Sequence, residues 1–496
     1  MSQYIGARYV PKFMGTYDNT QAYENMVVVD NGLGTSYISK VPVPAGTPLT
    51  DTDYWALYGT SNGAIINLQN QIDAIVPKLT LVNVAEMIAK DLNAGDVVMT
   101  LGYVSAGDRG GAIYEISLIS NAYSITLNNG LFANILSRGG VTPQMFGIVS
   151  GEPSSTAQDK WDLYIDYVNN TDMCYFLLPR GTYNVHKGFI IDKNMIGEDS
   201  HATIAADDTI TDNFDDNKVT AHGIPYAING LLAVGDVTSY IRLENISLNC
   251  NENCFYGLYI PEVNKSNFSN IRISQCNGDG IVCARVWMCK FDTINVFQAK
   301  RTAFNLGFPT LVIMPSGGII TSCDFSNLYV QGFGNGYNPS GYGYAFQNVA
   351  YSAFKALACD ALEVATNCYI ISACNSISFD DIGFEGCSTG TSDLIRITSG
   401  SAINFRNICA LGCTMKSLIY IAGNCDTDVI GIYENNCTAS YYFDIRNNVT
   451  AGSHNITIGN DVIGTVRNNA VSVSYILNTP TQLEKCVNNV PHNLLA

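Results

Sequence analysis

The chain has 496 residues, of which 14% are charged, and its 26 Lys+Arg against 43 Asp+Glu give a formal net charge of −17. This length is too great for one ordinary hydrophobic core, so we expect several domains or a repeat array. The acidic balance argues against a nucleic-acid partner, which needs a basic face, and no apolar run reaches the ~18 residues that span a bilayer, so we expect no membrane insertion.

Residues 1–60 predict a small β module. Short strand-like runs alternate with turns that contain Pro and Gly, and aromatic side chains are frequent. These aromatics have two equally good interpretations, because they could stack on sugar rings or form the core that so small a module needs. They are Tyr17, Tyr23, Tyr37, Tyr54 and Trp55.

Residues 61–92 predict a helical linker with a short heptad seam, about two heptads long. Two heptads are too few to associate alone, so the seam would need help from neighbouring domains. The alternative is a lone amphipathic helix packed on the domain that follows. The seam residues are Ile65, Leu68, Ile72, Ile75 and Leu79.

We interpret residues 93–150 as a lead-in, 151–465 as the main domain and 466–496 as a C-terminal strand and tail. At the start of the main domain, AQDKWDLYIDYV places Trp161, Tyr164, Ile165 and Val168 on one helical face. We therefore expect a helix near 157–169 that caps the open end of the domain. The segment LLPRGTYNV that follows predicts a strand, a tight turn and a second strand.

One phrase recurs six times in the main domain, beginning with SNFSNIRISQC at 266 to 276. Each copy has period-2 alternation, which is typical of strands, and a break two residues after a phenylalanine, where a left-handed bend would fit Asn or Asp. The pattern predicts an all-β parallel solenoid. The aligned residues are Phe268, Phe291, Phe325, Phe354, Phe379 and Phe405, and the bend residues are Asn270, Thr293, Asn327, Ala356, Asp381 and Asn407.

A second apolar register recurs between these phrases and predicts another strand in each coil. Its longest steps contain insertions, such as GFGNGYNPSGYGY, that would form loops on one face. The residues expected to face inward are Leu258, Ile281, Phe304, Phe346, Tyr369, Ile395, Ile419 and Phe443.

The cysteines and histidines indicate neither disulfides nor a metal site. Cys276, Cys387 and Cys413 each lie eight residues after a repeat phenylalanine, where a small apolar side chain is needed, so we expect buried thiols. None of the 16 cysteines forms a paired CxxC spacing, and the five histidines are scattered. We expect no cofactor and no metal.

Acidic residues on neighbouring coils provide the leading catalytic hypothesis. Coils of a parallel solenoid stack about 4.8 Å apart, close to the ~5–5.5 Å between the carboxylates of a retaining glycosidase. At six residues after the phenylalanine, Asp360 and Glu385 would be neighbours, with Gln331 beside them as a substrate-binding residue. The alternative is that these are solvated surface acids. A second row of equivalent outward positions contains Arg396, Tyr420 and Asp444. These side chains could bind an acidic sugar by ion pairing and ring stacking, or they could simply pair with one another along the surface.

Three segments resemble known families, and their order is that of a bacteriophage tailspike. The coil phrases with LLPRGTYNV resemble the pectate-lyase-like superfamily of right-handed parallel β-helices, and AGDVVMTLGYVSAGDRGGAIYEI at 94 to 116 resembles the lead-in of tailspikes. The segment YDNT…YISK…VPAGTPLTDTDYWAL is similar to aromatic modules of the chitin-binding type in phage tail and baseplate proteins. No catalytic signature of the pectin-cleaving members is recognisable. NGDGI is similar to Asp-Gly segments of polygalacturonases, which makes Asp279 a second catalytic candidate or an ordinary turn residue.

The resemblance implies a homotrimer on the virion tail, with phage tail or baseplate proteins and a bacterial cell-surface polysaccharide as partners. The first hypothesis is a depolymerase, with glycoside hydrolysis preferred to lyase chemistry. The second is a receptor-binding protein that holds the glycan without cutting it. A cellular polysaccharide-degrading enzyme is disfavoured, since MSQYIGARYV lacks the pattern of a signal peptide. A purely structural tail component is a further alternative, and the N-terminal module could join the virion rather than bind sugar.

Overall fold

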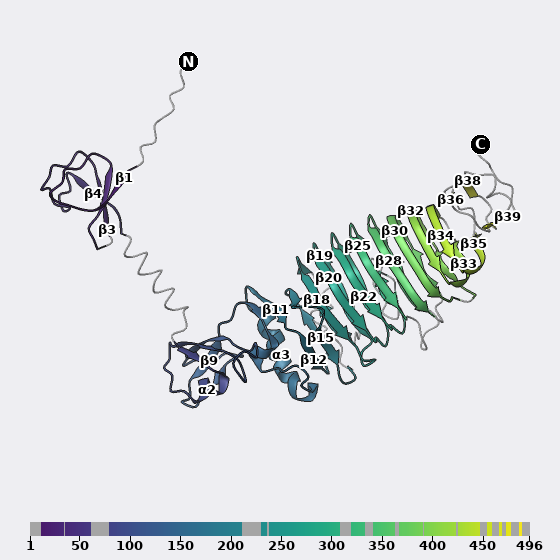
Figure 1. The fold of residues 1–496 in the computed structure, drawn as a ribbon, viewed down its shortest axis with the longest axis horizontal. Coiled ribbons are helices and arrows are strands. Elements are labelled where there is room, and N and C mark those ends of the chain that lie inside the picture. Colours follow the sequence, from purple (N-terminus) through teal and green to yellow (C-terminus); the bar gives the residue numbers. More distant parts are fainter. Residues whose placement is uncertain are drawn as a thin grey trace, which may run out of the picture.

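A computed structural model gives the structure of the chain (Figure 1). It describes residues 11–33, 35–60, 79–210, 230–235, 238–307, 319–332, 341–362, 367–389, 391–422 and 425–446, and the four short strands at 454–458, 466–468, 473–477 and 486–488. The strands of these residues form three sheets. The seam residues Ile65, Leu68, Ile72 and Ile75 lie outside the described residues.

The N-terminal module is a small sheet in the order β1-β2-β3-β4. Strands β2 and β3 are antiparallel, as are β3 and β4, whereas β1 runs parallel to β2. These four strands lie between residues 12 and 60. Its strands are β1 (Lys12–Thr16), β2 (Val27–Asp30), β3 (Thr35–Ser39) and β4 (Trp55–Thr60).

The lead-in is a five-stranded sheet with one short helix, α2 (Val84–Ala89). Asn83 caps this helix by accepting a hydrogen bond from the Glu86 amide. Leu79 begins strand β5 of this sheet, so the boundary expected at 93 is wrong and the lead-in already includes residue 79. The strands are β5 (Leu79–Leu81), β6 (Val97–Thr100), β7 (Ile113–Ser117), β8 (Ile125–Thr126) and β9 (Phe132–Ile135).

The rest of the described chain is one long parallel sheet wound into a solenoid, as predicted, with its strands stacked along the long axis in Figure 1. It is a right-handed parallel β-helix. The sheet starts earlier than expected, at β10 (Gly139–Val141), which pairs with β11 (Cys174–Leu178). It also continues through β37 (Val466–Asn468) and β39 (Cys486–Asn488), so the strands of the predicted tail extend the same sheet.

A helix packs against the first strands of the solenoid. Helix α3 (Ser154–Asn170) buries Trp161, Tyr164 and Val168 against β11 and β12 (Gly181–Val185). A short 3-10 helix, η1 (Pro143–Phe146), precedes it. The early strands that follow are β13 (Phe189–Ile191), β14 (Met195–Gly197), β15 (Ala202–Ala206), β16 (Gly230–Val234) and β17 (Thr238–Ser239).

The repeated phrase forms one continuous series of strands. The six phenylalanines pair in register, and their consecutive ring centroids lie 4.7–4.9 Å apart in a buried stack. All six bend residues have positive φ, between 51° and 57°, which confirms the predicted left-handed bend. The strands are β18 (Arg242–Asn249), β20 (Asn267–Ser274), β22 (Lys290–Phe297), β25 (Asp324–Gln331), β28 (Ala353–Leu362), β30 (Cys374–Cys387), β32 (Gly400–Leu411) and β34 (Cys425–Asn435), followed by β36 (His454–Ile458) and β38 (Val473–Leu477).

The second register is confirmed except at one coil. Phe304 pairs with Tyr344 rather than with Phe346, so the predicted alignment there is wrong by two residues. Both rings are fully buried, because alternate residues of the strand face the same way. The strands are β19 (Tyr256–Asn264), β21 (Ile281–Trp287), β23 (Phe304–Leu306), β26 (Tyr342–Gln347), β29 (Asn367–Ser372), β31 (Asp393–Ile397), β33 (Thr414–Ala422) and β35 (Thr438–Arg446), with short strands β24 (Ile320–Thr321) and β27 (Val349–Ala350) between coils.

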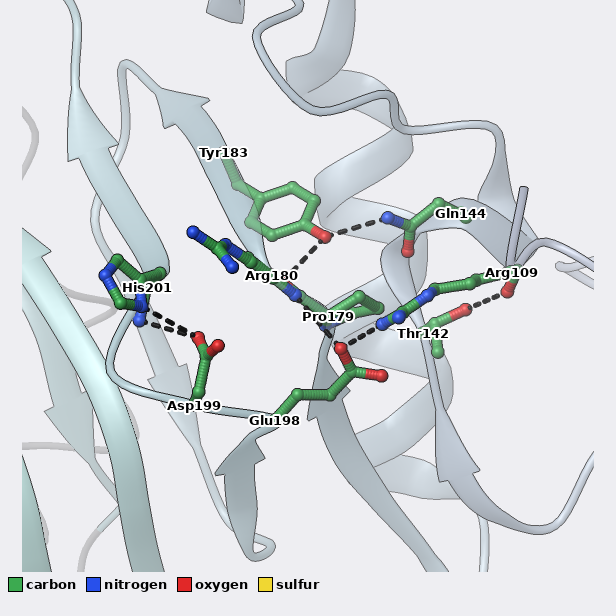
Figure 2. Close-up of polar contacts among 9 residues, drawn as sticks. All are labelled: Arg109, Thr142, Gln144, Pro179, Arg180, Tyr183, Glu198, Asp199 and His201. Atoms are coloured by element: carbon green, nitrogen blue, oxygen red, sulfur yellow. Dashed lines mark hydrogen bonds and ion pairs between the residues drawn. The ribbon is translucent and has the colours of Figure 1, made fainter. Parts of the chain in front are cut away.

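A polar junction attaches the lead-in to the first coil (Figure 2). The Arg109 guanidinium from the lead-in forms an ion pair with Glu198, and hydrogen bonding to Arg109 holds the pKa of Glu198 below its usual value. Beside it, Thr142 Oγ1 donates to the Arg109 carbonyl at 2.7 Å, and Gln144 Nε2 donates to the Tyr183 hydroxyl at 2.8 Å. The two parts are therefore linked by charged and neutral hydrogen bonds as well as by apolar packing.

The predicted buried thiols are present at Cys276, Cys387 and Cys413, which are fully buried. The cysteines from Cys174 to Cys437 are free thiols. In the same part of the chain, no His, Cys, Asp and Glu side chains group as a metal ion would require, and no helix has the length and apolarity to cross a membrane.

Candidate functional site

Asp360 and Glu385 lie directly opposite one another on adjacent coils, in strands β28 and β30. Gln331, on β25, is the neighbour of Asp360 on the other side. The Asp360 side chain is half-buried, whereas those of Glu385 and Gln331 are exposed. Register partners in a parallel sheet are about 4.8 Å apart, so the two carboxylates can approach one glycosidic bond together.

The left-handed bend explains why these acids point outward. After Ala356 the strand resumes its alternation, which turns Leu357 and Cys359 into the core and Ala358 and Asp360 out of it. Gly383 is the register partner of Ala358, and a Cβ added there would meet no atom within 4 Å. Small residues therefore leave open space beside the two carboxylates.

Tyr329 connects this acid pair to the preceding coils. Burial, its hydrogen bond to the Asp360 carboxylate and the nearby charges of Asp360 and Glu385 raise the pKa of Tyr329 to about 12. The Tyr329 ring contacts Phe297 with centroids 5.7 Å apart, and the Arg272 guanidinium lies 4.5 Å from the centroid of Phe297. A line of contacts thus zigzags along successive coils from Arg272 to the acids.

A groove of about 560 Å³ lies beside this line of contacts. Part of its wall comes from residues that follow the strands in left-handed conformation, which are Gln275, Gln298 and Gly332. Amide side chains, a phenyl ring and a guanidinium are groups that bind sugar hydroxyls, sugar faces and anions, respectively. The lining residues are Asn249, Arg272, Ser274, Gln275, Phe297, Gln298, Gln331 and Gly332.

Sequence analysis predicted Gln331 of this groove but did not identify Arg272, Phe297 or Tyr329. Their contacts are diagonal, between residues two positions apart on neighbouring strands, and a comparison of equivalent positions alone does not detect them. The available signal was that all three occupy outward positions of the repeated phrase, four or six residues after its phenylalanine.

Asp279 lies in a buried ion pair and not in the groove. Its side chain has no exposed surface, and both oxygens accept hydrogen bonds from Arg301, at 2.7 and 2.5 Å. The Thr302 amide and Asn305 Nδ2 each donate a further hydrogen bond at 3.0 Å. A carboxylate so enclosed cannot reach a polysaccharide, so the structure gives Asp279 a structural role in place of the predicted catalytic one.

The row of Arg396, Tyr420 and Asp444 has the predicted register, but its members are too enclosed to form a binding surface. Tyr420 is 4% exposed and Asp444 is fully buried. Arg396 Cζ lies 4.8 Å from the Tyr420 ring centroid, and Lys416 Nζ is 3.6 Å from Asp444 Oδ2. These side chains therefore contact one another and not a ligand. This matches the alternative interpretation of a paired row of side chains, except that the row is largely buried.

The five candidate aromatic residues of the N-terminal module belong to its apolar core or pack against it. Tyr23 and Trp55 are buried, and Tyr17 packs on both with ring centroids at 6.0 and 5.8 Å. Tyr37 and Tyr54 are half-buried and pack against the same cluster. The arrangement leaves Tyr23 and Trp55 without an exposed ring face for a sugar.

Comparison with known proteins gives a fold. Neither a protein-family model nor a curated protein matches the chain. Among solved structures, the gp42 tailspike of Acinetobacter phage vb_AbaP_AS12 is 14% identical, with 75% of each chain covered and a TM-score of 0.52. Tailspike protein 2 from an Escherichia coli O157:H7 bacteriophage is 13% identical over 94% of this chain and 65% of that one, with a TM-score of 0.44.

A third similar structure is Pantoea stewartii WceF, a glycan biofilm modifying enzyme, which is 10% identical over 74% of this chain and 48% of that one, with a TM-score of 0.38. None of these comparisons supports a chitin-binding-type assignment for the N-terminal module. The chain therefore has the parallel β-helix fold found in bacteriophage tailspikes.

Proposed function

We propose that the chain is a bacteriophage tailspike that binds a bacterial surface polysaccharide and depolymerises it by glycoside hydrolysis. The observation that supports this most directly is the pair Asp360 and Glu385, which are adjacent in register and lie next to Gln331, a residue that lines a groove of amide and aromatic side chains. The fold shared with a phage tailspike supports the same conclusion.

The surroundings of the two acids suggest distinct roles. The Tyr329 hydroxyl lies beside the Asp360 carboxylate and can orient it, so we assign Asp360 as the nucleophile that attacks the anomeric carbon. Glu385, which is exposed, donates a proton to the departing glycosidic oxygen. Glu385 then takes a proton from the water that hydrolyses the glycosyl–enzyme intermediate, so the sugar retains its anomeric configuration. Open space beside Gly383 accommodates the sugar ring.

The test is incubation of the purified protein with a panel of bacterial surface polysaccharides, followed by size-exclusion chromatography and reducing-end analysis. We expect one or more polymers to be shortened, with a new reducing end for each bond cleaved. Asp360→Asn and Glu385→Gln should each abolish cleavage, and Asp380→Asn, a half-buried acid of the same strand as Glu385 on the other side of the bend, should not. Cleavage retained by both amide variants would eliminate the assignment of the pair.

The same experiment distinguishes the alternatives. Retention of intact polysaccharide without cleavage would indicate a receptor-binding tail protein, and an unsaturated, ultraviolet-absorbing product would indicate a lyase. For the N-terminal module we propose attachment to phage tail or baseplate proteins, because its largest aromatic side chains are used in its own core.

A further inference from the structure

We propose that the groove around Arg272 is a subsite for a carboxylate-bearing sugar, so that the polysaccharide recognised by this chain is an acidic one. This inference rests on the proposed function, since it names the class of substrate for the same groove. It assigns Arg272 as the residue that determines specificity and Phe297 as the platform beneath the sugar.

The position of Arg272 provides the first argument. Its side chain is exposed at the groove, and its guanidinium is held over the Phe297 ring at 4.5 Å from the centroid. Within the described residues, no carboxylate lies within ion-pair distance of Arg272, in contrast to Arg242, Arg285 and Arg301, which pair with acids. The ring fixes the cation at the groove wall, where its N–H groups can bind an incoming carboxylate in bidentate geometry.

The remaining lining of the groove suits a sugar rather than a small inorganic anion. The side chains of Asn249, Gln275, Gln298 and Gln331 can donate and accept hydrogen bonds, as a polyhydroxylated ring requires. At about 560 Å³ the groove is much larger than a phosphate or sulfate ion needs. Phe297 is half-buried and lines the same groove, so its accessible part can contact the apolar surface of a sugar while the ring holds Arg272.

The distance to the acid pair explains how an acidic protein binds an acidic polymer. Arg272 and Asp360 are three coil steps apart, through β20, β22, β25 and β28, or about 14 Å at ~4.8 Å per step. This separation exceeds the Debye length of about 8 Å at physiological ionic strength, so the Asp360 and Glu385 charges scarcely repel an anion at Arg272. The acidic sugar therefore binds a few units from the cleaved bond, along a polymer that lies parallel to the solenoid axis.

The experiment uses the full chain carrying Asp360→Asn, which prevents degradation during binding. Each polysaccharide that the protein retains is labelled and tested in two forms, native and carboxyl-reduced, in which carbodiimide activation and borohydride convert the carboxylates to primary alcohols. Affinity is measured by biolayer interferometry at low and high salt. Three further substitutions, Arg272→Gln, Phe297→Ala and Arg406→Gln, are compared in the same background.

We expect carboxyl reduction to weaken binding about tenfold, the value of one charge-assisted hydrogen-bonded pair at an exposed site. Arg272→Gln should weaken binding of the native form by a similar factor and leave the reduced form unchanged. Phe297→Ala should weaken both forms, and Arg406→Gln, an exposed arginine of β32 outside the groove, should weaken neither. High salt should weaken the native form only.

Retention of a neutral polysaccharide, or native binding that Arg272→Gln leaves intact, would overturn this inference while the proposed tailspike function stands. Cleavage that survives both Asp360→Asn and Glu385→Gln would overturn the catalytic assignment and not the subsite. Failure to retain any polysaccharide of an acidic and neutral panel would overturn both.

Discussion

Asp279 and Asp360 are both solenoid aspartates, and their surroundings determine what each can do. Asp279 receives four hydrogen bonds, from Arg301, Thr302 and Asn305, and is fully buried. Asp360 is half-buried beside open space. A buried charge with all of its acceptors occupied stabilises a fold, and an accessible carboxylate next to a second one can take part in catalysis.

Asp279→Asn should lower the free energy of unfolding by about 3 kcal/mol, because the buried Arg301 guanidinium loses its counter-charge. A matched control is the ion pair of the residue next to Arg301. Lys300 pairs with the exposed Glu252 at 2.6 Å, and Glu252→Gln should lower the free energy of unfolding by less than about 1 kcal/mol. Denaturant unfolding measures both. The folded fraction of Asp279→Asn should keep its cleavage activity. Loss of cleavage activity in a folded variant would indicate instead that Asp279 belongs to the active site.

At this scale the sequence predicts positions better than contacts. The pairing of Asp360 with Glu385 follows from counting residues after each phenylalanine, since a strand has a fixed period of two. The Arg301–Asp279 pair joins a loop to the next coil, and the Tyr329–Asp360 hydrogen bond is diagonal. Both depend on side-chain direction, which spacing does not specify.

At the scale of elements, the bend after each phenylalanine determines where the two faces of a coil meet. Asn270 Nδ2 donates to Asn245 Oδ1 at 2.8 Å, and Asn407 Nδ2 donates to Asp381 Oδ1 at 2.9 Å, so the bend residues of neighbouring coils are linked. Ala356 is the one of the six predicted bend residues whose side chain has no polar group, although its φ is 55°. Its backbone is strained in a conformation that Asn and Asp tolerate.

Ala356→Asn should therefore raise the free energy of unfolding by about 1 kcal/mol, by relieving the left-handed strain. Ala358→Asn provides the control, because Ala358 lies two residues further along the same strand, in extended conformation, and should give no gain. Denaturation midpoints of the two variants and the parent chain test this. Equal effects at the two positions would mean that the bend at 356 stores no strain.

The element boundaries show where sequence patterns are ambiguous. Tyr344 and Phe346 are both buried, so hydrophobicity alone fits either of them opposite Phe304, and an insertion before them hides the true spacing. Similarly, Leu79 continues the heptad pattern yet begins strand β5, because pairing with Val98 overrides helical periodicity. The repeats themselves were predictable because each copy repeats the same core and bend.

The junction of Figure 2 should respond to acid. Because Arg109 lowers the pKa of Glu198 in the folded chain, the contribution of this pair is complete above the unfolded value of about 4.3 and is lost as the pH falls through the lower folded value. The protection factors of the amides in the lead-in and first coil, which correct hydrogen exchange for the intrinsic rate at each pH, should therefore fall at low pH. Glu198→Gln should accelerate exchange there already at pH 7, and no change in this variant would mean that the ion pair does not hold the junction.

At the scale of the whole molecule, we predict a homotrimer. The tailspike resemblance implies three chains around one axis, and light scattering of the purified protein should give about three times the 53.7 kDa chain mass. Because the trimer would form from identical chains, its dissociation should depend on concentration. Dilution of a weak trimer should lower the measured mass towards that of a single chain. A mass of one chain at high concentration would contradict the predicted trimer but not the solenoid fold.

The stack of phenylalanines also has a mechanical consequence. Each of the four inner rings contacts the rings of the coils before and after it, and the phrases are separated by 23, 34, 29, 25 and 26 residues. A solenoid pulled from one end should therefore yield coil by coil rather than all at once. Each rupture would release a segment of roughly 80–120 Å at about 3.4 Å per residue, so an optical-tweezers trace should show a ladder of unequal steps, with the 34-residue segment between Phe291 and Phe325 giving the longest of these five.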